Sequence, residues 1–356
     1  MRNIIVLLLT LLIVISCSDE FSLAENDIDL TKDWEETVGV FSNLNLHDRK
    51  HYIRISRGFA GNNFFLSNTN PDSIYFDPSQ IEVNLYKIRV HQIVDGIITE
   101  ADTLGVYPCR DTILPKDTLG MFYTDEVPLW YAETKAFSVT NADDLYVGLQ
   151  IITPNREISS FTNMIPETEF VYPNQFLPRF PIENNTFDAR IRLPRLSQIY
   201  RVEGNCSYFE ITKINGVTDK TLKTFNFLVG SRRINDPVED YGETYLWRVS
   251  TDIFYSGIER DVLQNGDTVN TIARILDGIS FSGYAGNADL ALISTGLSVI
   301  SGFSDEPIHF SNIRNGLGYF SAFAQFNTKK FPYSYETIDS VVNAYGGKYY
   351  FRRDYE

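Results

Sequence analysis

Short runs of alternating apolar and polar side chains recur along most of this chain, and they limit its fold more than any other feature. Residues 37–41, 51–57 and 81–90 each place apolar side chains at about every second position. Successive side chains of a strand point to opposite faces, so this period of two is typical of a strand with one buried face. Residues 45–50 and the Asp95-Gly96 pair supply turns between such runs. We therefore expect a mainly β protein.

The first of two expected domains covers residues 33–170. It contains six or more short runs of this kind, including residues 129–132 and 145–152, with no helical period between them. Many short strands without helices bury their faces as two packed sheets. The pattern predicts a β-sandwich of immunoglobulin-like or transthyretin-like form.

A second β-rich domain is expected over residues 171–356, because a chain of 356 residues is long enough for two cores. A proline-rich connector between residues 166 and 181 separates the domains, since proline lacks the N–H that a strand ladder needs. Asn215-Gly216 predicts a hairpin. Mixed apolar spacing predicts one short helix over 251–264, and strands resume after it, including residues 290–300.

The N-terminal residues carry the pattern of an export signal. Arg2 precedes a largely apolar run over residues 4–15, which is shorter than the roughly 20 helical residues of a membrane span. Val14-Ile15-Ser16-Cys17 resembles the bacterial lipobox, whose cysteine is acylated and becomes the first mature residue. The resemblance implies a lipoprotein signal peptide over residues 1–16 and palmitate on Cys17. A secretory signal with a chance cysteine is the alternative.

The residues after Cys17 are polar and acidic, and residues 17–32 are interpreted as an acylated cysteine and its tether. Ser18, Asp19 and Glu20 resemble the short acidic signal that sends many lipoproteins of Bacteroidota to the outer face of the outer membrane. The resemblance implies lipid anchoring in the outer membrane with the protein facing the cell exterior. A solvated acidic linker is the alternative.

Composition and charge exclude some partners. The chain has 43% hydrophobic residues, and its 25 Phe and 21 Tyr favour strands. The formal net charge of −15 argues against a nucleic-acid partner, because binding to phosphates needs clustered Lys and Arg. An acidic, globular, exported protein is the simplest interpretation.

Cysteine and histidine offer little metal or redox chemistry. Cys109 and Cys206 remain once Cys17 is acylated; a bridge between them is possible in an oxidising compartment, and two separate thiols are favoured. Four scattered histidines do not suggest a zinc or iron site, and His47 and His51 are expected at the surface. We expect no metal and no cofactor.

Two further patterns have a functional and a structural interpretation. Asn315-Gly316-Leu317-Gly318 would form a backbone cradle for a phosphate or sugar, or a tight turn with glycine at positive φ, which is favoured. Trp34, Trp130, Tyr131 and Trp247 would stack on sugars or, as aromatics of β-sandwiches usually do, form core.

The strings at residues 51–55, 70–75, 287–292 and 310–321 resemble an uncharacterised family of Bacteroidota outer-membrane lipoproteins, over residues 34–325. The Ser-Asn-Ile-x-Asn-Gly-x-Gly-x-Phe string is the most specific of them. The resemblance implies an extracytoplasmic β-rich lipoprotein of unknown function and supplies no catalytic residues.

Asp followed by Ser or Thr and an aliphatic residue occurs six times, which exceeds what average composition would produce. The tripeptide resembles the O-glycosylation acceptor of exported Bacteroidota proteins. Turn chemistry of Asp, Ser and Thr before a strand is the alternative. The acceptor hydroxyls would belong to Ser73, Thr103, Thr112, Thr118, Thr268 and Ser340.

These observations favour a surface binding or assembly protein, in ligand capture, as an accessory of an outer-membrane transporter, or in adhesion. The commonest hydrolase strings, such as Gly-x-Ser-x-Gly and His-Glu-x-x-His, do not occur in the sequence. We therefore name no catalytic residue. The alternative is an extracellular hydrolase that acts on glycans through a pair of carboxylates.

Overall fold

The computed structural model describes residues 37–57, 75–94, 97–115, 126–134, 137, 144–166, 168–182, 185–234, 242–300 and 311–354. Strands dominate these residues, so the predicted mainly β fold is confirmed. The strands are β1 (Val38–Asn45), β2 (Lys50–Arg57), β3 (Glu82–Val94), β4 (Ile97–Pro108), β5 (Arg110–Pro115), β6 (Glu126–Glu133), β7 (Leu145–Ile152), β8 (Glu157–Asn163), β9 (Phe170–Tyr172), β10 (Thr186–Arg192), β11 (Ile199–Ile214), β12 (Val217–Arg233), β13 (Thr244–Ser250), β14 (Thr271–Gly286), β15 (Leu317–Asn327) and β16 (Phe351–Arg352). The helices are the short 3-10 helix η1 (Pro78–Gln80) and the α-helices α4 (Asp252–Asn265), α5 (Ala288–Ile300) and α6 (Tyr335–Tyr349).

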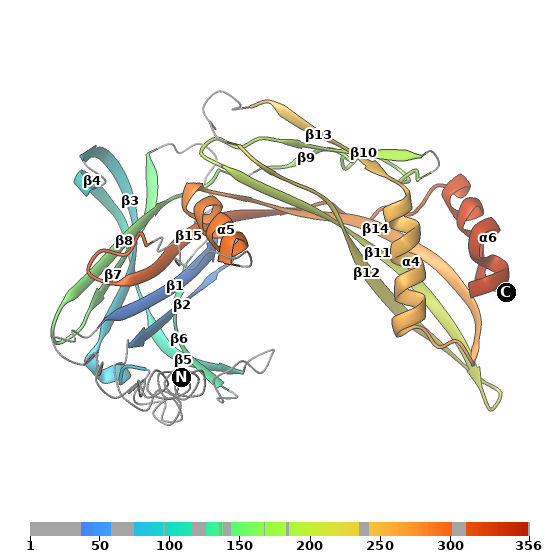
Figure 1. Ribbon diagram of the computed structural model, residues 1–356, viewed down its shortest axis with the longest axis horizontal. Helices are drawn as coiled ribbons and strands as arrows, with labels where there is room; N and C mark the ends of the chain where they lie inside the picture. The colour runs from blue at the N-terminus through green and yellow to red at the C-terminus, as the bar shows by residue number, and fades with distance from the viewer. Residues whose placement is uncertain are drawn as a thin grey trace, which may run out of the picture.

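The largest sheet runs through the whole molecule in the order β12-β11-β14-β15-β1-β2-β6-β5, with β16 paired to β14 beside this path. Its middle is the parallel pairing of β1 with β15, from Gly39 opposite Leu317 to Asn45 opposite Phe323. Figure 1 shows this sheet arching from β5 and β6 to β11 and β12. Strands from both expected domains share it, so the pairing crosses the predicted boundary near residue 170.

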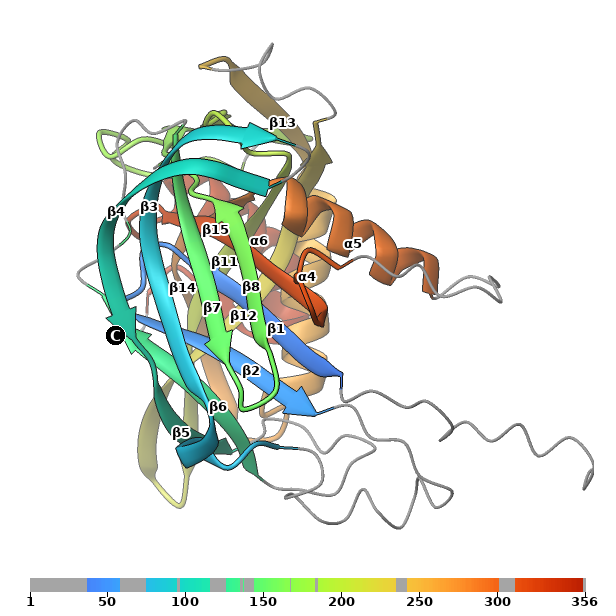
Figure 2. The same ribbon diagram turned by 90° about the vertical axis from the view of Figure 1, so that its left-hand side faces the viewer.

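The first half of the molecule is sandwich-like. A sheet in the order β4-β3-β7-β8 lies over β1 and β2, and Figure 2 shows its four strands side by side. Val83 and Leu85 of β3 and Ile53 and Ile55 of β2 are buried in the same core. The period of two in each strand turns these alternate residues inward, as the sequence predicts.

In the second half, one face of β11, β12 and β14 is covered by the sheet β13-β10-β9 and by α4 and α6 (Figure 1). The ring centroid of Phe187 on β10 lies 6.0 Å from that of Phe227 on β12. The ring centroid of Phe254 on α4 lies 6.2 Å from that of Phe225 on the same strand. Aromatic rings therefore fill both parts of this interface.

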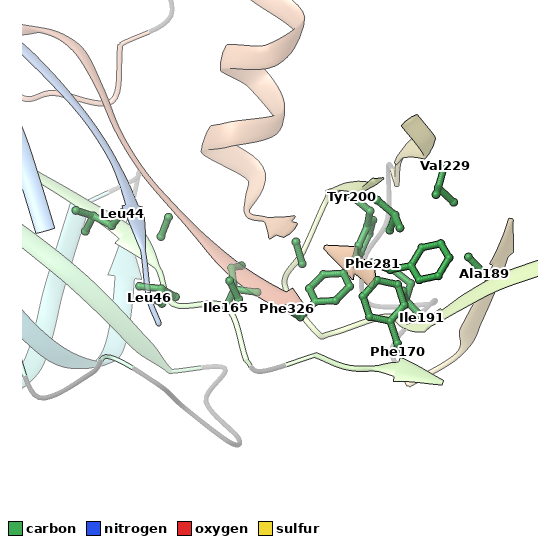
Figure 3. Close-up of a cluster of buried hydrophobic side chains, with 14 of the residues drawn as sticks. Leu44, Leu46, Ile165, Phe170, Ala189, Ile191, Tyr200, Val229, Phe281 and Phe326 are labelled. Carbon is green, nitrogen blue, oxygen red and sulfur yellow. The ribbon is translucent and has the colours of Figure 1, made fainter. Parts of the chain in front are cut away.

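The two halves share one hydrophobic core. Figure 3 shows Leu44 and Leu46 on one side, Phe281 on the other, and Ile165 and Phe326 between them. All five belong to a single cluster of buried side chains. The joint between β1 and β15 is therefore packed as well as hydrogen-bonded.

The helix predicted over 251–264 is confirmed by α4. The strand predicted over 290–300 is wrong, because these residues form α5. The side-chain oxygen of Asn287 accepts a hydrogen bond from the Leu290 N–H at 3.1 Å, which caps the helix at its first turn. An apolar run of this length fits a strand or a helix equally well, and here the cap decides.

Helix α6 is absent from the sequence prediction, which expects strand and loop up to the end of the chain. The Ser334 hydroxyl accepts the Thr337 N–H at 3.1 Å, and Tyr350 ends the helix in the left-handed conformation at φ 60°. Gly346 and Gly347 lie in its last turns, and glycine lowers helix propensity by about 1 kcal/mol per residue. These two glycines hide the helix in the sequence, while packing against α4 supports it in the fold.

His51 is buried, so the expectation of a surface position is wrong for this residue. It is 2% exposed, its Nε2 lies 3.0 Å from the Thr134 hydroxyl, and its ring packs on Phe137. Burial lowers the pKa of His51 to about 4. His51 shares the inward face of β2 with Ile53 and Ile55, and the period of two could have placed it there.

Cys109 and Cys206 are free thiols. Burial raises the pKa of each to about 12. Thiolates are the reactive form of cysteine, so neither residue has the electrostatic environment of a nucleophile.

The Asn215-Gly216 hairpin is confirmed, with Asn215 at φ 50° and Gly216 at φ 82° between the paired residues Ile214 and Val217. Positive φ at both central positions is typical of a type I′ turn. Asp95-Gly96 lies outside the described residues, between Val94 and Ile97, which pair with each other as a two-residue hairpin requires.

Candidate functional site

A cleft of about 820 Å³ lies beside the joint between the two halves. Its walls come from three parts of the chain that are distant in sequence: the turn after β1, the segment around β9, and the end of β15. Its lining residues are His47, Thr168, Glu169, Phe170, Val171, Pro173, Asn174, Gln175, Phe176, Arg192, Gln325, Phe326, Asn327, Thr328, Lys329 and Phe331. We call this the joint cleft.

The joint cleft exists because the pairing of β1 with β15 stops early. The last pair is Asn45 with Phe323, and the Leu46 N–H still donates to the Phe323 carbonyl at 2.9 Å. The chain then turns, with the Asp48 N–H donating to the Asn45 carbonyl. β15 continues to Asn327 without β1 beside it, which leaves room along this edge.

The opposite wall is the segment from Thr168 to Phe176. The Asn174 side chain accepts the Phe176 N–H at 3.0 Å, and the Asn174 carbonyl accepts the Leu177 N–H at 3.1 Å. This turn presents the Phe176 side chain to solvent with 81% of it exposed. A large aromatic so exposed beside a cleft is available to a ligand.

The floor of the joint cleft is apolar. Phe170 and Phe326 lie with ring centroids 5.0 Å apart, and the Phe331 ring is fully buried beside them. These rings belong to the common core, so the floor is rigid. A rigid floor under polar walls suits a preformed binding site.

Charged side chains line the joint cleft. The Lys329 ammonium donates to the Gln175 carbonyl at 2.6 Å and so bridges the two walls. Arg192 and Glu169 form an exposed ion pair at 3.5 Å. Glu169 is the one carboxylate among the described lining residues, so these residues do not provide a pair of carboxylates.

A second cleft, of about 520 Å³, does contain two carboxylates, Asp77 and Asp111. Asp77 caps η1 by accepting hydrogen bonds from the N–H and hydroxyl of Ser79, and these bonds lower the pKa of its carboxyl. A general acid for glycoside hydrolysis needs a raised pKa. Asp77 is therefore a structural cap and does not fit that role.

The residues proposed for anchoring and export, Cys17, Ser18, Asp19 and Glu20, lie outside the described residues, as does Trp34. The other aromatics proposed for sugar stacking lie away from the joint cleft. Trp247 is 9% exposed and belongs to the core cluster. Trp130 is partly buried and packs against the same core cluster. Tyr131 is half-buried beside Tyr52, with ring centroids 6.2 Å apart.

The four proposed acceptor hydroxyls that the structure describes lie on different elements. Thr103 on β4 and Thr268 after α4 are exposed, whereas Thr112 on β5 and Ser340 in α6 are half-buried. Ser73 and Thr118 lie outside the described residues.

Turn chemistry accounts for one of the four described tripeptides. The Asp267 side chain accepts the N–H groups of Val269 and Asn270 at 2.8 and 2.9 Å, which forms an Asx turn before β14. The tripeptides that begin at Asp102 and Asp111 lie inside strands, and the one that begins at Asp339 lies inside α6. Turn chemistry therefore does not explain why the tripeptide occurs at Asp102, Asp111 and Asp339.

The glycine-containing string at residues 315–318 is a turn, as favoured from the sequence. Asn315 has φ 60° and Gly318 has φ 112°, and a Cβ on Gly318 would lie 2.0 Å from the Val40 carbonyl oxygen. The Asn312 side chain donates to the Phe320 carbonyl at 2.7 Å and accepts the Phe320 N–H at 2.9 Å. The string thus positions β15 against β1.

The sequence marks none of the lining residues of the joint cleft as functional: His47 is expected only at the surface, and residues 168–176 only as part of the proline-rich connector. The others are common polar and aromatic types without a motif, and they meet only through the pairing of β1 with β15. No local pattern marks them.

Among the residues that the structure describes, no group of three or more His, Cys, Asp or Glu side chains could hold a metal ion. Within the same residues, no helix combines the length and the apolar character needed to cross a membrane.

No protein-family model and no curated protein matches this chain. The solved sporulation control protein Spo0M from Bacillus subtilis matches at 10% identity and a TM-score of 0.19, over 50% of this chain and 54% of its own. The C-terminal globular domain of an oligosaccharyltransferase from Pyrococcus abyssi matches at 10% identity and a TM-score of 0.23, over 70% of this chain and 46% of its own. The chain thus spans about half the length of each, and TM-scores this low do not indicate a common overall fold.

Proposed function

We propose that this protein is a surface-exposed outer-membrane lipoprotein that captures an extracellular ligand in the joint cleft. The observation that carries the proposal is the cleft itself, with its volume of about 820 Å³, its buried aromatic floor and its polar walls. Ligand sites combine an apolar surface with a few fixed polar groups in this way. The ligand is a component of the cell surface or of a transporter, or a glycan.

The anchor in this proposal is an acyl chain on Cys17, followed by the acidic residues 18–32. Acyl chains contribute about 0.8 kcal/mol per buried CH₂, so a multiply acylated cysteine holds a protein at a membrane without a spanning helix. Fractionation tests this part, because Cys17→Ser protein should leave the membrane fraction while it keeps its fold. A Cys17→Ser protein that still sediments with membranes after a high-salt wash would contradict the anchor.

Capture fits the joint cleft better than hydrolysis does. Glycoside hydrolysis uses two carboxyl groups at a set separation, and the described lining has one carboxylate, which is paired with Arg192. Amide and hydroxyl groups of Asn174, Gln325, Asn327 and Thr168 line the walls instead. Such groups hold and orient a ligand without reacting with it.

The test is affinity capture from native outer membranes with the lipidated protein and a matched pair of variants. Phe176→Ala removes the exposed ring at the joint cleft, and Leu263→Ala removes a side chain that is 62% exposed on α4, away from the cleft. We expect the wild type and Leu263→Ala to recover one transporter component or glycan in stoichiometric amount, and Phe176→Ala to recover at least about tenfold less. Equal recovery with Phe176→Ala would reject the joint cleft as the binding site.

A further inference from the structure

The edge of β15 that faces the joint cleft has no paired strand in the described part of the chain. Strand residues alternate the direction of their backbone groups, and the Phe323 carbonyl points toward β1, where it accepts the Leu46 N–H. By the same alternation, the N–H and C=O groups of Gln325 and Asn327 point to that side. β1 has ended there, and β14 pairs with β15 on the other side.

The opposite wall also offers a strand edge. β9 is the last strand in the order β13-β10-β9, and its residues Phe170 and Val171 line the joint cleft. The joint cleft therefore lies between the edges of two different sheets. Unpaired strand edges are templates for the main chain of another polypeptide.

The dimensions fit a short extended segment. His47, in the turn after β1, lines this space, and the Lys329 ammonium contacts the Gln175 carbonyl across it. At about 3.3 Å per residue, the length of β15 and its continuation from 325 to 329 matches roughly four or five residues of an added strand.

Lys329 sets the charge that such a segment should carry. Its ammonium group donates to a neutral carbonyl and lies 5.3 Å from the centroid of the Phe331 ring, and it forms no ion pair with a carboxylate of the described residues. A carboxylate near this end would supply the missing countercharge. It could belong to an acidic side chain or to a C-terminus.

We propose that the joint cleft binds an extended peptide segment that pairs with the edge of β15 and places a carboxylate at Lys329. This inference rests on the proposed function, because it takes the joint cleft as the ligand site and names the ligand class. The bound main chain takes the place beside Gln325 and Asn327 that β1 leaves empty. Apolar side chains of the segment contact Phe176, which is 81% exposed.

The proposal is tested by panning a random heptapeptide display library with free C-termini on the purified full-length protein. Asn327→Pro removes the N–H that faces the cleft and leaves the ladder with β14 intact, since Asn327 and Ser282 form a pair without mutual hydrogen bonds. Asn327→Ala is the matched control, because it changes the side chain and keeps the N–H. We expect selected peptides to bind Asn327→Pro at least about tenfold more weakly than Asn327→Ala.

A second measurement does not depend on the fold of a proline variant. Hydrogen exchange of the wild type should slow at the Gln325 and Asn327 amides when a selected peptide is bound. A library without any enriched peptide, or enriched peptides that bind Asn327→Pro as well as Asn327→Ala and leave both amides unprotected, would overturn the proposal.

The source of the carboxylate is resolved with Lys329→Met and with C-terminally amidated peptides. A loss of about tenfold on amidation in the wild type, absent in Lys329→Met, assigns the contact to the peptide C-terminus. The same loss on replacing an acidic side chain assigns it to that side chain. If neither amidation of the C-terminus nor replacement of an acidic side chain weakens binding, the proposal that a carboxylate lies at Lys329 is wrong.

An oligosaccharide array run on the same variants separates this inference from the proposed function. A glycan that binds the wild type but not Phe176→Ala, and that is insensitive to Asn327→Pro, would support capture in the joint cleft and reject the peptide. If neither a glycan, a peptide nor a membrane component binds, the proposed function fails as well.

Discussion

The beginning and the end of β15 differ in how their outer edge is covered. From Leu317 to Phe323 the strand pairs with β1, and Gly318 fits so closely against Val40 that no side chain has room there. From Gln325 onward the same edge faces the joint cleft. One strand thus contains a closed segment that holds the two halves together and an open segment beside which a ligand has space. We expect substitutions in the closed segment to affect stability and those in the open segment to affect binding.

The largest expected effect is that of Gly318→Ala in the closed segment. The added Cβ would lie 2.0 Å from the Val40 carbonyl oxygen, at a φ of 112° that side-chain residues rarely adopt. We expect a loss of at least about 3 kcal/mol in the free energy of unfolding, measured with urea. Gly216→Ala, at φ 82° in open space on the β11–β12 hairpin, should cost only about 1 kcal/mol.

The pH dependence of stability should show a contribution from His51, which lies on β2, the strand that pairs with β1. Its pKa of about 4 in the folded state is below the usual 6.5, so the unfolded chain binds the extra proton between these values. Stability should therefore fall as the pH drops from about 6.5 to about 4, by about 3 kcal/mol for this group.

His51→Gln is the control for this titration, because glutamine keeps a polar group for the Thr134 hydroxyl but does not titrate. Protonation would make both ring nitrogens donors, and the His51 Nδ1 has no hydrogen-bond partner in the described part of the chain. Urea unfolding at several pH values should give a shallower acid dependence for the variant. Identical acid dependences would contradict the assignment.

Asn312→Ala should have the next largest effect. The Asn312 side chain makes two hydrogen bonds to the Phe320 backbone, at 2.7 and 2.9 Å, and so fixes the position of β15 in the closed segment. Removing both leaves buried backbone groups unpaired, and we expect a loss of about 2 kcal/mol in the free energy of unfolding. A loss below about 0.5 kcal/mol would show that β1 alone determines the position of β15.

Asn45→Ala should have the smallest effect, because it acts at the edge of the open segment. The Asn45 side chain donates one hydrogen bond to the Gln325 side chain at 3.1 Å, in a partly exposed position. We expect a loss of about 0.5 kcal/mol in urea unfolding. A loss as large as that of Asn312→Ala would remove the distinction between the two segments.

The strands were predictable because their signal is local. The period of two in residues 51–57 and 81–90 predicts a strand with one buried face, whichever element covers that face. β2 and β3 confirm the two strands. The same period places His51 inward, but the polarity of histidine led to the wrong expectation. The errors at α5 and α6 have other causes. The apolar run of α5 fits a strand or a helix, and the cap at Asn287 decides for the helix. The two glycines of α6 weaken its helical signal in the sequence, and packing supports the helix in the fold.

The joint cleft was not predictable, because no local pattern encodes it. Its lining depends on how far β1 extends along β15, and the Asn43 and Ser321 side chains that meet in this joint are 278 positions apart in sequence. Phe176 has no motif around it, and its exposure follows from the turn at Asn174. Pairing between distant strands has to be known before such a site can be located.

The central place of β1 in the long sheet has a consequence for folding. During synthesis, β1 emerges early, whereas its parallel partner β15 emerges only near the end of the chain. Contacts this distant in sequence close slowly, because the entropy of the intervening loop is lost before the pairing stabilises the product. One edge of β1 can pair with β2 at once, but the edge that pairs with β15 stays without its final partner until nearly the whole chain has been made. A truncation before Leu317 should therefore leave this edge of β1 open to aggregation.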